Sequence, residues 1–213
     1  MTAKSLNEQF RIVLASASPR RSEILNLAGL SFDVWPSDKE ETTTKTDPGQ
    51  ICCELARTKA LDVASSIKTY GKNHPDITTE SDTIVIGADT IVAKGDRIFG
   101  KPKDEDDAAR MLRELSGVTH SVYTGVCLVF MSSDGRVGEH TFFEETKVTF
   151  YPVDEDEIAE YIGREDVLDK AGAYGIQAGA ASFVKGIDGD FFNVVGLPLS
   201  RMMHEISKLL SDG

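Results

Sequence analysis

The chain has 213 residues, with 35 acidic and 23 basic side chains and a net charge of −12 at neutral pH. This acidic balance argues against a nucleic-acid partner, because phosphate backbones are bound by broad basic surfaces. The apolar runs are too short to cross a bilayer, and the first residues contain no apolar signal-peptide core. We therefore expect a cytoplasmic protein that does not bind membranes, folded as a single domain over residues 1–213.

Apolar periodicity and turn residues predict alternating strands and helices. Strands are expected at 12–15, 32–35, 121–130 and 140–150, and helices at 19–28, 51–67, 104–116, 154–162 and 198–210. The stretch 83–102 is expected to form a buried strand, an interruption at 87–90 and a hairpin that turns at 94–96.

The remaining segments have weaker patterns. They are expected to form polar loops at 37–50 and 70–82, an irregular glycine- and alanine-rich stretch at 168–182, and a small hairpin at 183–192. Alternating strands and helices indicate an α/β protein. Because the long hairpin between 121 and 150 breaks a purely parallel pattern, we expect a mixed sheet, with two lobes around a cleft.

The segment LASASPRR, residues 14–21, places two arginines at a predicted strand-to-helix turn. A helix N-terminus leaves backbone N–H groups unpaired and attracts phosphates. Ser16, Arg20 and Arg21 would add hydroxyl and charged donors there. Alternatively, both arginines point into solvent or pair with surface carboxylates. On these residues alone both interpretations stay open.

The segment VIGADTIV places Asp89 inside a buried, β-branched run. An aspartate is costly to bury unless it is paired or binds a metal, so we favour a functional role, as a cation ligand or an orienter of water. Thr90 would add a hydroxyl contact. The alternative is an aspartate that satisfies a turn between two strands. Lys101 and Lys170 are the most suggestive lysines, although a lone lysine is usually a solvated surface charge.

Several motifs occur together in one order. They are LASASPRR (14–21), GADTIV (87–92), KP after a short hairpin (101–102), LSGVTHSVYTGV (115–126), DKAGAYGIQ (169–177) and VVGLPL (194–199). On these motifs the sequence resembles the Maf family of nucleoside triphosphate pyrophosphatases, from about residue 11 to residue 210.

The resemblance implies a two-lobed α/β/α fold with a long mixed sheet and a central cleft, similar to inosine triphosphatases. It also implies hydrolysis of a nucleoside triphosphate between the α and β phosphates, with a divalent cation, Mg²⁺ or Mn²⁺, as cofactor. The nucleoside triphosphate would be the partner of the site, and the protein would form a homodimer.

By position, the resemblance implies that Asp89, Glu41 and Lys101 are catalytic, and that Asp89 and Glu41 also hold the metal. The substrate would be bound by Ser16, Arg20, Arg21, Lys59, Thr90, Lys170 and Gln177. Arg20, Thr90 and Gln177 match the marker positions of the subgroup that prefers dTTP and UTP. The Gln177 amide offers donors and an acceptor that match the edge of uracil or thymine.

Arg21 would either share the anion or brace the turn. Two alternatives remain for the function: a pyrophosphatase of the same family that prefers 7-methyl-GTP, and a nucleotide-binding regulator without catalysis.

Overall fold

The computed structural model describes residues 2–70 and 81–211. Within these residues one mixed sheet has seven strands, in which β2, β1, β3, β5, β6 and β7 are neighbours in that order and β4 pairs with β3. The strands are β1 (Arg11–Leu14), β2 (Asp33–Val34), β3 (Thr83–Lys94), β4 (Arg97–Phe99), β5 (Thr119–Met131), β6 (Val137–Phe150) and β7 (Val184–Asp188). β1 is parallel to β2 and β3, and all other pairs are antiparallel. The predicted mixed sheet is confirmed.

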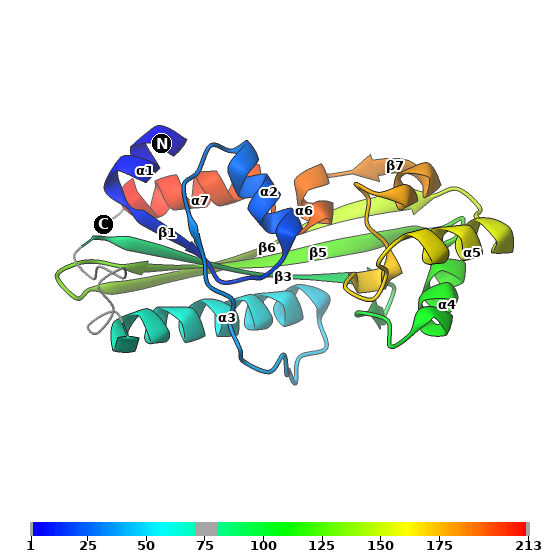
Figure 1. Ribbon diagram of the computed structural model, residues 1–213, viewed down its shortest axis with the longest axis horizontal. Coiled ribbons are helices and arrows are strands. Elements are labelled where there is room, and N and C mark those ends of the chain that lie inside the picture. The colour runs from blue at the N-terminus through cyan, green and yellow to red at the C-terminus, as the bar shows by residue number, and fades with distance from the viewer. Residues whose placement is uncertain (1, 71–80, 212–213) are drawn as a thin grey trace.

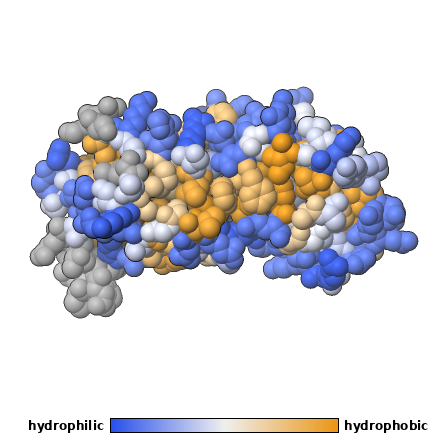
Figure 2. Space-filling model, turned by 90° about the horizontal axis from the view of Figure 1, so that it is seen from above, coloured by the Kyte–Doolittle hydropathy of each residue, from blue (hydrophilic) through white to orange (hydrophobic). Residues whose placement is uncertain are grey.

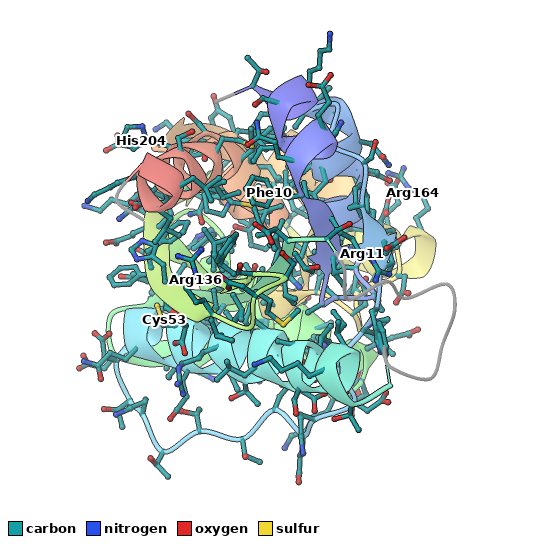
Figure 3. The ribbon with its side chains drawn as sticks, turned by 90° about the vertical axis from the view of Figure 1, so that its left-hand side faces the viewer. Phe10, Arg11, Cys53, Arg136, Arg164 and His204 are labelled. Carbon is teal, nitrogen blue, oxygen red and sulfur yellow. The ribbon has the colours of Figure 1, made fainter. Side chains whose placement is uncertain are left out.

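Helices cover both faces of this sheet, which gives the expected three layers (Figure 1). The helices are α1 (Ala3–Gln9), α2 (Pro19–Leu27), α3 (Pro48–Tyr70), α4 (Glu105–Leu115), α5 (Glu155–Arg164), α6 (Phe191–Val195) and α7 (Leu199–Ser211), with short 3₁₀ helices η1 (Ala171–Ala173) and η2 (Gly179–Phe183). A view along the sheet places Cys53 on α3 below it and His204 on α7 above it (Figure 3).

The face seen from above carries a band of apolar residues along its middle, with hydrophilic residues along both sides (Figure 2). No helix within the described residues is long and apolar enough to cross a membrane.

Local sequence signals explain where the helices begin. Asp104 accepts a hydrogen bond from the Asp107 N–H at the start of α4. Asp154 and Glu157 form the predicted capping box of α5. Pro19 occupies the first position of α2, where its missing N–H costs nothing. These three predicted starts are confirmed.

The predicted interruption at 87–90 is wrong, because β3 continues unbroken through it and pairs with β5 at every residue from Thr83 to Ala93. Gly87 is needed for close packing and not for a turn. A Cβ atom there would lie 2.2 Å from the Ala56 carbonyl oxygen of α3. The small residue therefore lets α3 approach β3, which brings the side chains of α3 close to Asp89.

The predicted hairpin at 183–192 is also wrong. The β7 strand pairs with β6 instead of folding back on itself. Gly189, with a φ of +128°, then turns the chain into α6, which Asp190 caps through the Phe192 N–H. Of the two predicted loops, 37–47 contains no helix or strand, and residues 71–80 of the second lie outside the described residues.

The order of the strands leaves an opening beside β3. The last contact of β1 with β3 is followed by a hydrogen bond from the Ala15 N–H to the Ile86 carbonyl. β4 pairs with the same edge of β3 only from Val92 onward. Between these points no described strand pairs with that edge, so side chains on both faces of β3 can border one pocket.

Candidate active site

A pocket of about 500 Å³ lies at this open edge of β3. All ten residues predicted for the site border it. They come from the β1–α2 turn (Ser16) and the first turn of α2 (Arg20, Arg21), the loop before α3 (Glu41), α3 itself (Lys59), β3 (Asp89, Thr90), the segment after β4 (Lys101) and the segment around η1 (Lys170, Gln177). The fold therefore brings together residues that are far apart in the chain, since Ser16 and Gln177 are separated by 161 positions.

One cluster in the pocket consists of a lysine between two carboxylates. The Lys59 Nζ atom lies 2.7 Å from Glu41 Oε1 and 2.7 Å from Asp89 Oδ1. Lys59 and Asp89 are largely buried, with 13% and 10% of their side chains exposed. Burial alone would raise the pKa of Glu41, but its hydrogen bond to Lys59 and the charges of Lys59, Lys101 and Arg21 bring that pKa below its ordinary value. Both carboxylates are thus held near one positive charge.

Asp89 lies in the middle of β3 and pairs in register with Gly125. The alternative that it satisfies a turn between two strands is therefore wrong. Its neighbour Thr90 points to the opposite face of the sheet, as strand alternation requires, and shares a 3.0 Å hydrogen bond with Thr124.

The two adjacent arginines have different environments. Arg21 is buried and donates hydrogen bonds to the Gly196 carbonyl at 2.9 Å, to Ser16 Oγ at 2.8 Å and to Thr90 Oγ1 at 3.3 Å. Burial lowers the pKa of Arg21 below its ordinary value. These contacts tie the β1–α2 turn to β3 and to the residue that ends α6, so Arg21 braces the turn.

Arg20, in contrast, points toward the segment before η1. Its Nη1 atom lies 2.9 Å from Asp169 Oδ2, and Lys170 Nζ lies 2.7 Å from the other oxygen, Asp169 Oδ1. Lys170 also donates to the Asp166 carbonyl. A single carboxylate thus joins two of the predicted phosphate-binding cations.

Two further predicted residues are exposed at the pocket. Lys101 and Gln177 have no hydrogen-bond or ion-pair partner among the residues that the structure describes. Lys101 is therefore a free cation and Gln177 a free amide, both available to a ligand.

Part of the pocket is apolar. Val92, Val122, Tyr174, Ile176 and Val194 contribute to its wall. An apolar surface beside a free amide suits a nucleobase, whose faces pack against apolar groups while its edge needs polar partners.

Residues 11–209 match the family model described as "Maf-like protein". The chain belongs to the Maf family. A dTTP/UTP pyrophosphatase of Agathobacter rectalis is 53% identical over 95% of this chain and 98% of its own length. Proteins of the same description from Lachnoclostridium phytofermentans and Bacillus cereus are 48% and 45% identical, each over 95% of this chain and 97% of their own.

The pocket of this Maf chain is positively charged within an acidic protein. Five cations border it (Arg20, Arg21, Lys59, Lys101 and Lys170), against three carboxylates (Glu41, Asp89 and Asp169). The excess of two positive charges contrasts with the net charge of −12 for the whole chain. An anionic ligand would therefore be attracted to this cleft rather than to the rest of the surface.

The donor set also fits a divalent cation. Glu41 and Asp89 already place one oxygen each within 2.7 Å of the same ammonium group. No cluster of three or more histidine, cysteine or carboxylate side chains within the described ranges could hold a metal alone. Mg²⁺ is commonly bound by one or two carboxylates together with substrate phosphates and water, and these two carboxylates match that pattern.

No role was predicted for Thr124, Asp169 or Gly196, although the structure places each next to a predicted site residue. Asp169 and Gly196 lie in two of the matching motifs, which was the available signal. Thr124 lies in a third, beside Gly125, where a Cβ would meet the backbone of Cys52 at 2.3 Å.

Proposed function

We propose that this chain hydrolyses dTTP and UTP between the α and β phosphates, releasing a nucleoside monophosphate and pyrophosphate. The observation that carries the proposal is that the Glu41–Lys59–Asp89 cluster and further cations border the same pocket. The names of relatives that are 45–53% identical over 95% of the chain support the choice of substrate.

Charge balance supports a triphosphate bound with a metal. A nucleoside triphosphate carries about four negative charges at neutral pH, whereas the pocket residues supply an excess of two positive charges. One divalent cation would supply the other two. We propose Mg²⁺ or Mn²⁺ held by Glu41 and Asp89, which would neutralise charge on the phosphates and on the departing pyrophosphate.

The side chains of the pocket have separable roles in this proposal. The Asp89 carboxylate accepts a hydrogen bond from the attacking water, orients it toward the α phosphate and takes its proton. Lys101, which has no partner among the described residues, and the cations Arg20 and Lys170 bind the phosphates. Arg21 keeps the turn that carries Ser16 in place.

The base would lie against the apolar wall near Gln177. The Gln177 amide would pair with N3–H and a carbonyl of uracil or thymine. Thr90 also lines this pocket, although its hydroxyl already contacts Arg21 and Thr124.

The test is a panel of dTTP, UTP and 7-methyl-GTP, each with and without Mg²⁺ or Mn²⁺, in which released pyrophosphate is measured. We expect turnover of dTTP and UTP that requires the metal. Asp89→Asn is expected to lower that turnover by about 10³-fold or more, because the variant cannot accept the proton. Asp96→Asn, an exposed change in the β3–β4 turn, is the control that keeps full activity.

Three other outcomes of this panel would change or refute the proposed function. Preference for 7-methyl-GTP would change the substrate within the same reaction. Tight binding of dTTP without turnover would favour a regulator over an enzyme. Full activity of Asp89→Asn would remove this carboxylate from the reaction.

We also propose that the protein is a cytoplasmic homodimer, which the family resemblance supports. Light scattering coupled to gel filtration measures the mass of the particle, and a mass of one 23.2 kDa chain would contradict the dimer.

A further inference from the structure

Asp169 lies between two cations that come from distant parts of the chain. Its Oδ2 atom is 2.9 Å from the Arg20 guanidinium, at the start of α2, and its Oδ1 atom is 2.7 Å from Lys170 Nζ, at the start of η1. The Asp169 side chain is 43% exposed, whereas only 27% of Arg20 and 11% of Lys170 is exposed. The carboxylate is therefore the most exposed member of this group of three charges.

This arrangement is the one that a phosphate group would make with the same cations. A phosphate also presents two or more anionic oxygens, and both arginine and lysine bind phosphate and carboxylate oxygens alike. Burial alone would raise the pKa of Asp169, but its hydrogen bonds to Lys170 and Arg20 outweigh this effect. The pKa therefore lies below its ordinary value. The carboxylate is therefore negatively charged at neutral pH and repels a phosphate that approaches the pair.

We propose that Asp169 is an internal competitor for phosphate, whose carboxylate occupies the Arg20–Lys170 anion site whenever no polyphosphate is bound. A polyphosphate that binds these cations displaces it, and it returns when the product leaves. Its effect is to weaken the binding of pyrophosphate and so to favour product release. This inference rests on the proposed function for the identity of the polyphosphate, and it adds a positioning residue that acts on the phosphate through Arg20 and Lys170.

The test compares Asp169→Asn with Asp166→Asn. Asparagine keeps the size of the side chain and one acceptor for Arg20 or Lys170, but it removes the competing charge. Asp166 lies three residues earlier, and its exposed carboxylate has no partner among the described residues. It is therefore a matched control for the loss of one negative charge near the cleft.

Calorimetry measures the binding of inorganic pyrophosphate and tripolyphosphate, with Mg²⁺ present and no nucleotide. Asp169→Asn is expected to bind both at least about fivefold more tightly than the wild type, which corresponds to about 1 kcal/mol. Asp166→Asn is expected to stay within about twofold of the wild type, since it removes a charge that touches neither cation. Unchanged or weaker binding by Asp169→Asn would overturn the proposal, because a residue that only holds Arg20 and Lys170 in place would weaken binding when altered.

Steady-state kinetics provide a second readout. If dTTP is turned over, Asp169→Asn is expected to show a lower KM and stronger inhibition by added pyrophosphate, with the inhibition constant reduced by a similar factor. If the wild type binds tripolyphosphate but hydrolyses no nucleotide, a tighter Asp169→Asn variant would support this inference while the proposed function failed. If the wild type binds neither anion, the inference is overturned.

Discussion

Gly87 links the packing of the molecule to its proposed chemistry, and Gly87→Ala tests that link. A Cβ atom at this position would lie 2.2 Å from the Ala56 carbonyl oxygen and 2.8 Å from the Ala60 N atom. Both contacts are to the backbone of α3, which cannot rotate away as a side chain can. Since ordinary contacts begin near 3.4 Å, α3 would have to move by about 1 Å.

This movement affects the site directly, because Lys59 belongs to the turn of α3 between these two alanines. Gly87 and Asp89 are two residues apart on one strand, so they face the same side of the sheet. A shift of α3 away from β3 would lengthen the 2.7 Å contact between Lys59 and Asp89. Overpacking of this kind costs about 1–3 kcal/mol, and a misplacement of about 1 Å at a site can reduce activity about 10²-fold.

Thermal unfolding and pyrophosphate release from dTTP measure the two effects. For a chain of this size 1 kcal/mol shifts the Tm by about 2–4 °C, so we expect Gly87→Ala to lower the Tm by about 2–12 °C and the turnover about 10²-fold. The control is Gly138→Ala on β6, where a Cβ would meet only Phe130 Cβ at 3.9 Å. If Gly87→Ala matched Gly138→Ala in both Tm and turnover, the argument that α3 positions Lys59 through this contact would be refuted.

Two further predictions concern buried polar groups. Arg21→Ala is expected to lower the free energy of unfolding by about 2 kcal/mol, because buried acceptors lose their donor. Arg20→Ala is expected to leave the Tm within about 2 °C and to raise the KM for dTTP, and a larger loss of stability for Arg20→Ala than for Arg21→Ala would contradict this division. Burial, with the charge of Lys94, lowers the pKa of His120 from 6.5 to about 4, so the unfolded chain takes up this proton first as the pH falls. The free energy of unfolding is therefore expected to fall between about pH 6.5 and pH 4. Measured with urea, the decrease between pH 7 and pH 4.5 should be roughly 2 kcal/mol smaller for His120→Gln than for the wild type.

Local signals were sufficient for most elements of the fold. The starts of α2, α4 and α5 could be predicted because Pro19, Asp104 and Asp154 act on backbone groups within their own first turn. Gly87 was misread because a glycine in a strand pattern has the same local appearance whether it breaks the strand or admits a neighbouring element. The deciding contact, with α3, lies about 30 residues away.

The two arginines show the same limit within the site. Both follow Pro19 on the first turn of a helix, where consecutive side chains point about 100° apart. Which of them is buried depends on the Gly196 carbonyl, 175 residues later in the chain. From the sequence, Arg20 could be favoured as the ligand-binding arginine and Arg21 left either to share the anion or to brace the turn, and the buried contacts of Arg21 favour the second role.

Two lysines of the site, Lys59 and Lys170, are more deeply buried than their residue type predicts. In the sequence Lys59 has the pattern of a solvated surface charge, and Lys170 stands out only by its glycine- and alanine-rich neighbours, yet the fold leaves only 13% and 11% of their side chains exposed. Covering a charge is unfavourable unless an opposite charge lies beside it, and each of these lysines has such a partner, Asp89 or Asp169. The cleft therefore contains a positive charge between carboxylates and a negative charge between cations. In the proposed function, the phosphates would take the place of Asp169 beside Arg20 and Lys170, and the divalent cation would lie with Glu41 and Asp89, so a metal-bound polyphosphate would match this alternation of sign.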